Sequence, residues 1–300
     1  MRLIHVTDPH LTSLDDQSLA GLSAKRALSY LSWRRKRRFH HDRSALTHLT
    51  EAVRREQADQ ILVTGDLTHI GLAEEARVAR PWLESLGSPE QVMLVPGNHD
   101  LMSRDSWGPV ARHWGDYMHL DPHLAGGTIQ DAFPVVREFE DAVVIGVASA
   151  HPTPILLASG SLGEAQMARL ELAARDVREQ GKFCCLLIHH PPVPGVVGRR
   201  RALADAIALE SLLERQSVDL VLHGHTHRNE EIALGGRMIY STASASSISA
   251  HAPAAYRVID VERDADGGWQ VEMTLKSLTA GDGQQRRLEL VEQARWHAGP

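Results

Sequence analysis

The stretch Gln91-Val92-Met93-Leu94-Val95-Pro96-Gly97-Asn98-His99-Asp100 decides how we interpret the fold. It begins as a short apolar run and ends in a loop with an amide, an imidazole and a carboxylate. An apolar run of this length predicts a strand that is buried on both faces. The glycine lets the backbone turn sharply beside the polar side chains. Similar junctions recur along the chain, so one architecture is expected to account for most of it.

Short apolar runs alternate with helix-like segments along the chain. This alternation predicts an α/β layered fold with central β-sheets flanked by helices. Glycine-rich turns at Gly235-Gly236 and Asp264–Gly268 predict C-terminal β-hairpins. The predicted strands are Leu3–Val6, Gln60–Val63, Gln91–Val95, Ala142–Val147, Phe183–Ile188 and Val218–Leu222, followed by hairpin strands within Glu231–Ile239, Tyr256–Val261 and Trp269–Leu275. The predicted helices are Ser44–Gln57, Ala73–Leu86, Gly163–Gln180 and Asp205–Arg215.

No clear boundary divides the chain, so we interpret residues 1–280 as a single domain with a basic helical insertion at about 20–43. The last twenty residues, 281–300, are polar and weakly patterned, and we expect a tail or a short helix around Arg286–Arg295. The chain has 300 residues, of which 43% are hydrophobic and 23% charged, as expected for a globular protein with a sizeable core. The N-terminus already resembles a strand, and the two cysteines are adjacent, which favours a reduced, cytoplasmic location.

Charge and histidine content restrict the class of function. The formal net charge is −6, which argues against a protein that binds nucleic acid with its whole surface, and we expect no nucleic-acid partner. Histidine is abundant, with 18 residues, and this abundance indicates metal chemistry.

Metal-ligating side chains follow five of the predicted strands. We expect these strands to share one sheet. Ligand sites of open α/β sheets lie beyond the carboxyl ends of the strands, so the loops would bring their side chains together along one edge. Mixed carboxylates and imidazoles suit Mn, Fe, Zn or Co. Seven ligands are too many for one tetrahedral ion but suit two ions about 3.5–4 Å apart, which can clamp a phosphoryl group and generate hydroxide. The loops are Asp8-Pro9-His10, Gly65-Asp66, Gly97–Asp100, His189-His190-Pro191 and His223–His227.

The ordered motifs Asp-x-His, Gly-Asp, Gly-Asn-His-Asp, His-x-Pro and Gly-His-Thr-His span residues 8–227. Together they resemble the calcineurin-like metallophosphoesterase superfamily, most closely its bacterial cyclic-nucleotide and glycerophosphodiester phosphodiesterase group. The resemblance implies hydrolysis of a phosphodiester or pyrophosphate bond by metal-bound hydroxide, with a small phosphodiester or nucleotide-containing substrate. It also implies two divalent or mixed-valence transition metal ions as cofactors.

The resemblance further implies a role for each site residue. His99 would lie near the leaving group, and Asp100 would orient His99 from behind. His189 is favoured over His190 as a ligand because the family's ligand precedes the proline by two positions. The implied ligands are Asp8, His10 and His227 for the first metal, Asn98, His189 and His225 for the second, and Asp66 as the bridge.

The basic insertion carries the run Trp33-Arg34-Arg35-Lys36-Arg37-Arg38. Drawn as a helix, Ala24–Arg43 has one small apolar face and another face where cationic and aromatic side chains alternate. That second face suits an anionic membrane surface, a large anionic substrate or nucleic acid, although a solvated helix that caps the core is equally compatible. The apolar face consists of Ala24, Ala27, Leu28 and Leu31, and the cationic-aromatic face of Arg26, Tyr30, Trp33 and Arg37. A second basic cluster, Arg199, Arg200 and Arg201, is placed to meet a substrate phosphate.

Three other functions stay open at this point. A peripheral-membrane pyrophosphatase of the UDP-2,3-diacylglucosamine type, at the inner face of the membrane, would use the basic insertion. A non-catalytic protein-binding scaffold of the same fold would lack ligand histidines, whereas here all the ligand positions are filled. A DNA exonuclease would need a broader basic groove than a chain of net charge −6 provides.

Overall fold

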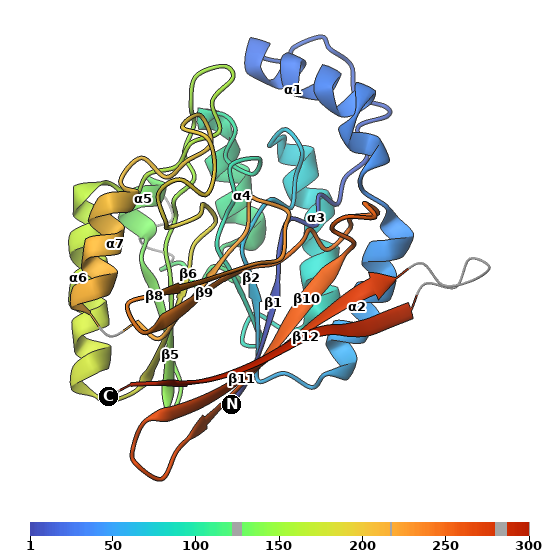
Figure 1. Ribbon diagram of the computed structural model, residues 1–300. Helices are drawn as coiled ribbons and strands as arrows, with labels where there is room; N and C mark the ends of the chain where they lie inside the picture. Colours follow the sequence, from blue (N-terminus) through green and yellow to red (C-terminus); the bar gives the residue numbers. More distant parts are fainter. Residues whose placement is uncertain (122–127, 217, 280–286, 300) are drawn as a thin grey trace.

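The computed structural model describes residues 1–121, 128–216, 218–279 and 287–299, which fold into two mixed β-sheets flanked by helices (Figure 1). The first sheet has the strand order β12-β11-β10-β1-β2-β3, and the second has the order β4-β5-β6-β7-β9-β8. The first-sheet strands are β1 Arg2–Val6, β2 Gln60–Val63, β3 Val92–Leu94, β10 Ala255–Arg263, β11 Trp269–Thr279 and β12 Arg287–Ala298. The second-sheet strands are β4 Val135–Glu138, β5 Ala142–Gly146, β6 Phe183–Leu187, β7 Leu220–His223, β8 Glu230–Leu234 and β9 Arg237–Ser241.

Helices cover the outer faces of both sheets, with α6 and α7 over the second sheet and α2 and α3 beside the first (Figure 1). The predicted α/β class is therefore confirmed. The α-helices are α1 Ala24–Arg35, α2 Arg43–Arg55, α3 Ala73–Leu86, α4 Trp107–Trp114, α5 Ile129–Ala132, α6 Gly163–Glu179 and α7 Ala206–Arg215, and the 3-10 helices are η1 Arg37–Phe39 and η2 Arg104–Ser106.

The main core lies between the two sheets, and the alternation of side chains along each strand assigns them to one core or another. In β6, Phe183, Cys185 and Leu187 belong to the main core. Cys184 and Leu186 point the other way and pack beneath α6 and α7. Successive side chains of a strand face opposite sides of the sheet, so one apolar run can line two cores.

The expectation that five ligand-bearing strands share one sheet is wrong. β1, β2 and β3 are parallel neighbours in the first sheet, whereas β6 and β7 are parallel neighbours in the second. An apolar run predicts a buried strand but not its partner, and here two sheets pack face to face around a common core. The carboxyl ends of both parallel sets still point to the same end of the molecule (Figure 1).

The expected terminal helix around Arg286–Arg295 is also wrong, because β12 occupies this part of the described chain and pairs antiparallel with β11. The physical reason is an alternation of period two, in which Leu288, Ala294 and Trp296 face the main core. Both predicted hairpins are confirmed, as β8 with β9 and as β10 with β11.

The basic insertion forms α1 and η1 above the carboxyl ends of the strands (Figure 1). The face of α1 that was expected to meet a membrane packs against the protein instead. Arg26, Tyr30 and Trp33 are buried, whereas Leu28 is 48% exposed. The aromatic rings belong to a small separate core with Leu14, Ile70 and Met102. The cationic-aromatic face is therefore turned toward the protein, and its buried members are not available to a membrane surface.

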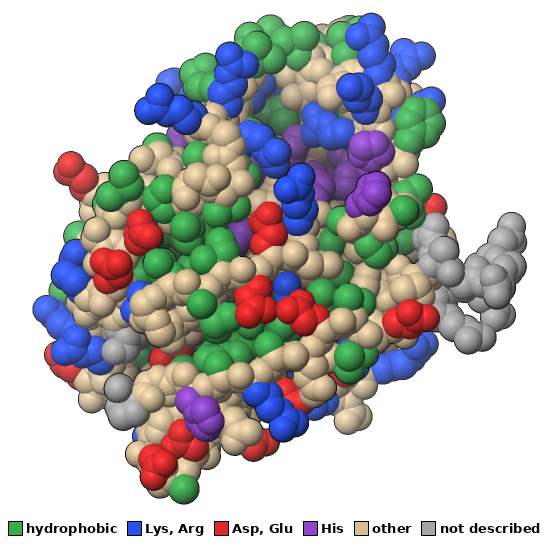
Figure 2. Space-filling view, in the orientation of Figure 1, with side chains coloured by type: hydrophobic (Ala, Val, Ile, Leu, Met, Phe, Trp, Pro, Cys, Tyr) green, Lys and Arg blue, Asp and Glu red, His purple; other side chains and the backbone are tan. Residues whose placement is uncertain are grey.

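Within the described ranges, no helix combines the length and the apolar composition that crossing a bilayer requires. Lysine and arginine side chains gather around the insertion, directly beside a cluster of histidines (Figure 2).

Candidate metal centre

Strand register brings the ligand-bearing loops together. Val6 of β1 pairs with Val63 of β2, so the loops that follow leave the first sheet side by side. They remain joined, because the Asp8 N–H donates to the Gly65 carbonyl at 3.0 Å and the His10 N–H donates to the Asp66 carbonyl at 3.1 Å. The loops carrying Asp8, His10 and Asp66 are thereby held in contact beyond the sheet edge.

The predicted ligands converge in two overlapping groups. In each group, one potential ligand atom of every residue lies within 4.8 Å of the others. Asp66 belongs to both groups, at the place where a bridging carboxylate is needed. The first group is Asp8, His10, Asp66 and His227, and the second is Asp66, His189 and His225.

Asn98 completes the second group. Its Oδ1 lies 3.1 Å from Nε2 of His189 and 2.7 Å from Nδ1 of His225. All seven predicted ligand residues are therefore found at one site, which is built from loops of both sheets.

The backbone at this site adopts a rare conformation. A positive φ is uncommon for residues other than glycine and costs about 1–3 kcal/mol each, so it persists where function or packing requires it. Gly65 also has a positive φ, and a Cβ there would lie 2.3 Å from the Gly97 nitrogen, so the two loops touch through backbone alone. The ligand residues with positive φ are Asp8, His10, Asp66, His225 and His227.

Hydrogen bonds to carbonyls orient two imidazoles toward the centre. His189 donates from Nδ1 to the Thr64 carbonyl at 2.6 Å, and His10 donates from Nδ1 to the Thr68 carbonyl at 2.9 Å. Each Nε2 is then left with a lone pair that faces the site, which is how metal-binding histidines are commonly held. His10 Nε2 lies 3.3 Å from Nε2 of His227.

Two buried ligand atoms have no hydrogen-bonding partner in the described part of the chain. Asp8 Oδ1 and His225 Nε2 are both in this position, although Nε2 of His227 faces Asp8 Oδ1 at 3.1 Å. The second Asp8 oxygen accepts from the hydroxyl of Thr7 at 2.7 Å and from the N–H of His225 at 3.0 Å. Unsatisfied buried polar atoms are costly, and a cation among them removes that cost. The residues present therefore fit transition metal ions.

Electrostatics favours positive charge around Asp66. Burial alone would raise the pKa of Asp66, but His189 and His99 beside it hold the pKa well below its usual value. Burial alone would lower the pKa of His189, but the Asp66 carboxylate raises it to about 9. The structure thus places an ionised carboxylate where either a proton or a metal ion is needed next to it.

His99 lies at the rim of this centre, and Asp100 does not orient it as expected. The His99 ring donates from Nδ1 to the His69 carbonyl at 2.6 Å. The Asp100 carboxylate instead accepts from the backbone N–H groups of Asp66 at 2.8 Å, Gly97 at 2.8 Å and Thr68 at 3.0 Å. The Asp100 carboxylate therefore joins the two ligand loops through their backbone N–H groups.

Arg37 of the insertion contacts His99. Its Nη1 lies 3.0 Å from Nε2 of His99, and its Nη2 donates to the Ser29 carbonyl at 3.3 Å. Burial lowers the pKa of His99 to about 4, and the charge of Arg37 acts in the same direction. A guanidinium group from the basic run therefore lies directly beside the metal ligands.

His190 and the predicted substrate-binding arginines contribute no side chain to the ligand groups. Both ring nitrogens of His190 are occupied, by the Ser149 hydroxyl at 2.8 Å and by the Ala158 carbonyl at 3.1 Å, so His189 is the member of the pair in the cluster. All three predicted substrate-binding arginines, Arg199, Arg200 and Arg201, are exposed. Arg201 alone of the three reaches a ligand loop, because its Nη2 donates to the backbone carbonyl of His225 at 2.9 Å.

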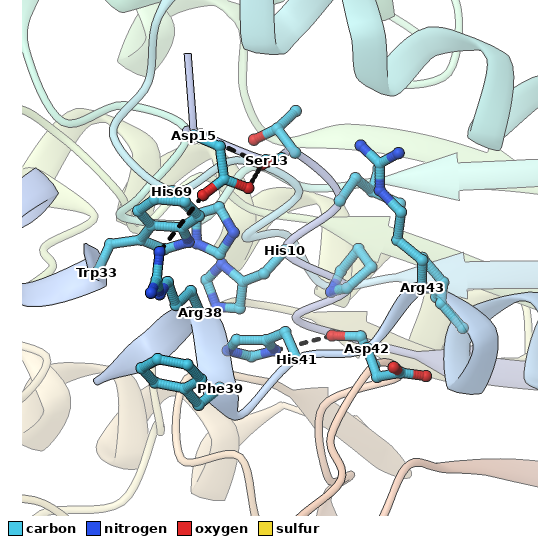
Figure 3. Close-up of a pocket in the computed structure, with 15 residues that line it drawn as sticks. His10, Ser13, Asp15, Trp33, Arg38, Phe39, His41, Asp42, Arg43 and His69 are labelled. Carbon is cyan, nitrogen blue, oxygen red and sulfur yellow. Dashed lines mark hydrogen bonds and ion pairs between the residues drawn. The ribbon is translucent and has the colours of Figure 1, made fainter. Parts of the chain in front are cut away.

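His41 belongs to no motif, and it nonetheless lies at the centre. Its ring centroid is 4.6 Å from that of His10, and its ligand atom forms a third group with His10 and His227 within 4.8 Å. Burial, and the neighbouring His227, lower the pKa of His41 to about 3. A pocket of about 540 Å³ adjoins these rings, with Trp33, Phe39 and Arg38 on its wall (Figure 3).

Comparison with known proteins agrees with this geometry. A glycerophosphodiester phosphodiesterase, GpdQ, of Enterobacter lignolyticus (strain SCF1) is 32% identical over 180 residues, which cover 58% of this chain and 57% of that protein, so the match spans less than two thirds of its length. A probable cyclic nucleotide phosphodiesterase of Synechococcus sp. (strain WH7803) is 27% identical over 251 residues, covering 76% of this chain and 75% of that protein.

Solved structures show the same fold at low sequence identity. A dimetal phosphatase from Danio rerio superposes with a TM-score of 0.59 at 15% identity and covers 98% of both chains. The purple acid phosphatase PPD1 from yellow lupin gives a TM-score of 0.56 at 12% identity, covering 98% of this chain and 53% of that one. The family model for calcineurin-like phosphoesterases matches residues 1–229. The chain therefore belongs to the calcineurin-like phosphoesterase family, whose members are metal-dependent phosphoesterases.

Proposed function

We propose that this protein hydrolyses a small phosphodiester at a centre of two transition metal ions. The observation that carries the proposal is that Asp66 belongs to both ligand groups. Two bound cations would supply Lewis acidity and would activate a water as nucleophile at neutral pH. One cation would be held by the first group and one by the second group together with Asn98, with Mn, Fe, Zn or Co suited to these donors.

The chain's own residues then define where a substrate lies. Arg37 forms no ion pair with any described carboxylate, so its guanidinium is free to bind an anionic oxygen. His99 lies between Arg37 and Asp66, because its ring contacts Arg37 and its backbone N–H donates to Asp66 Oδ1 at 2.7 Å. We place the leaving-group side of the substrate here, where charge-assisted hydrogen bonds stabilise developing negative charge.

The named activities of the two bacterial relatives support a diester as substrate. A small substrate also fits a site that the insertion partly covers. No observation favours the lipid-linked pyrophosphate substrate, because the cationic-aromatic face of α1 is turned inward.

The test compares wild-type protein with Asp66→Asn after both are loaded with Mn²⁺. We expect Asp66→Asn to bind fewer ions and to lose turnover of bis(p-nitrophenyl) phosphate, while its circular dichroism is retained. Asp266→Asn, an exposed change in the β10–β11 turn, is the matched control. Equal turnover in Asp66→Asn and the control would reject the bridging role.

A screen of the wild-type enzyme then tests the substrate class. It contains cyclic nucleotides, glycerophosphodiesters, UDP-diacylglucosamine and phosphomonoesters. We expect the highest kcat/KM for a diester. A wild-type chain that holds metal but hydrolyses none of them would favour the scaffold function.

A further inference from the structure

The end of the basic insertion is fixed to the loop between β9 and β10. The Asp42 N–H donates to the Ser246 carbonyl at 2.9 Å, and the Ile248 N–H donates to the His40 carbonyl at 3.1 Å. His41 and Ser247 form an antiparallel bridge between these bonds. The backbone of His41 is therefore held from both sides, so its side chain has a defined position.

Serine hydroxyls determine how the His41 ring is oriented. Ser246 Oγ lies 2.8 Å from Nδ1 of His41. Ser244 Oγ lies 3.4 Å from the same nitrogen and donates to the Asp8 carbonyl at 2.6 Å. Ser244 thus connects His41 to the backbone of the predicted ligand Asp8. The other ring nitrogen of His41, Nε2, has no hydrogen-bonding partner in the described part of the chain.

The ring lies beside His10, an imidazole of the first ligand group (Figure 3). Its centroid is 4.6 Å from that of His10 and 5.8 Å from that of His227. One ligand atom from each of these three residues lies within 4.8 Å of the other two. Nitrogens that bind one ion at about 2.0–2.1 Å lie at most about 4 Å apart, so imidazoles that already lie within 4.8 Å of one another can share an ion after a small movement of the rings.

We propose that His41 is an additional imidazole ligand of the metal position formed by Asp8, His10, Asp66 and His227. The inference rests on the metal centre of the proposed function and adds a ligand from the insertion. The first position would then have three imidazoles, whereas the second has two and the Asn98 amide.

This ligand set has a chemical consequence. Additional imidazole favours Zn, Fe or Co over Mg, whose preference is for oxygen ligands. We therefore expect the first position to retain its ion longer than the second when a chelator is added. The insertion would also be linked to metal loading, because His41 is held through the Ser246 loop.

The test measures metal binding directly, with Co²⁺ added to metal-free protein. Calorimetry gives the affinity of each position, and the visible absorption of Co²⁺ reports the number and kind of ligands. We expect His41→Ala to weaken one of two binding events about tenfold or more and to change the spectrum of that ion. His40→Ala, at the exposed neighbouring residue, is the matched control and should leave both quantities unchanged.

Two further measurements separate the outcomes. His41→Gln keeps a polar side chain and serves if the alanine variant does not fold, and circular dichroism checks both variants. Unchanged Co²⁺ affinity and spectrum in a folded His41 variant would overturn the inference, and a raised KM alone would make His41 a substrate contact. A wild-type chain that binds no metal would overturn the proposed function as well, so the two failures are distinguishable.

Discussion

Replacing Arg26 with methionine tests how the insertion is held over the metal centre. Arg26 is 7% exposed, and its guanidinium donates to the carbonyls of Ile70 at 3.1 Å and Gly71 at 2.6 Å. It also donates to the Ser106 hydroxyl at 3.0 Å and the Asp105 carboxylate at 2.7 Å. Methionine keeps much of the apolar stem but removes every donor, so the change isolates the polar contacts.

The expected magnitude follows from those bonds. A hydrogen bond to a charged group contributes about 1.5–3 kcal/mol, and contributions within one cluster are not additive. The Gly71 carbonyl keeps the Ser106 hydroxyl as a donor, whereas the Ile70 carbonyl loses the Arg26 donor. We estimate a loss of about 3 kcal/mol in the free energy that keeps α1 docked, which is roughly a 100-fold increase in its opening.

The opening should be local. The small core of Leu14, Tyr30, Trp33, Ile70 and Met102 is separate from the two larger cores, so α1 can detach without unfolding the sheets. Hydrogen exchange with mass spectrometry should show roughly 100-fold faster exchange in Ala24–Arg35 and little change in β6. Trypsin should also cleave the basic run sooner.

Arg34→Met is the matched control, because Arg34 is exposed in the same helix. The reasoning is refuted if α1 in Arg26→Met exchanges as slowly as in this control. Equal acceleration in α1 and β6 would refute it as well, because the insertion would then not be an independent unit.

Three further predictions concern the substrate, the metals and the cysteines. Arg37→Met should raise KM for bis(p-nitrophenyl) phosphate by about 10- to 100-fold, the effect of losing one charge-assisted hydrogen bond; the same KM as in the exposed control Arg35→Met would contradict the contact. Chelation should lower Tm, because each ion at 100 times its Kd contributes about 2.7 kcal/mol; a thermal scan without any shift would argue against bound metal. Burial raises the pKa of Cys184 and Cys185, so the thiols should resist Ellman's reagent at pH 8 until denaturant is added, and rapid labelling of native protein would contradict their burial.

Local patterns predicted most of the strands and helices. β2 and α3 begin and end at the predicted residues, and most other predicted elements are shifted by only one or two residues at their ends. β11 continues to Thr279, four residues beyond its predicted end, and the helix of the basic insertion ends at Arg35. The sheet partners were not predictable, because a run such as Phe183–Leu187 is apolar on both faces whichever sheet contains it. β12 was missed because Glu292 interrupts the face that carries Leu288, Ala294 and Trp296 and obscures the alternation.

The residues of the candidate site likewise fall into those that local sequence motifs predict and those whose position depends on the tertiary fold. Ligands within short motifs, such as Asp8 and His10, could be identified because each motif follows a predicted strand and the ordered motifs resemble those of a known family. His41 belongs to no motif, and Arg37 was assigned to the basic run but not to the metal centre; the position of both depends on how the insertion docks on distant loops. The role of Asp100 was wrong because the direction of one side chain depends on the turn after β3.

The most direct test of the central claim is the number and position of bound metal ions. Crystals of the wild-type chain grown with Mn²⁺ can be measured at an X-ray wavelength where manganese scatters anomalously. We expect two anomalous peaks about 3.5–4 Å apart, one on each side of the Asp66 carboxylate. A single peak, or two peaks that do not share Asp66, would contradict the dinuclear centre.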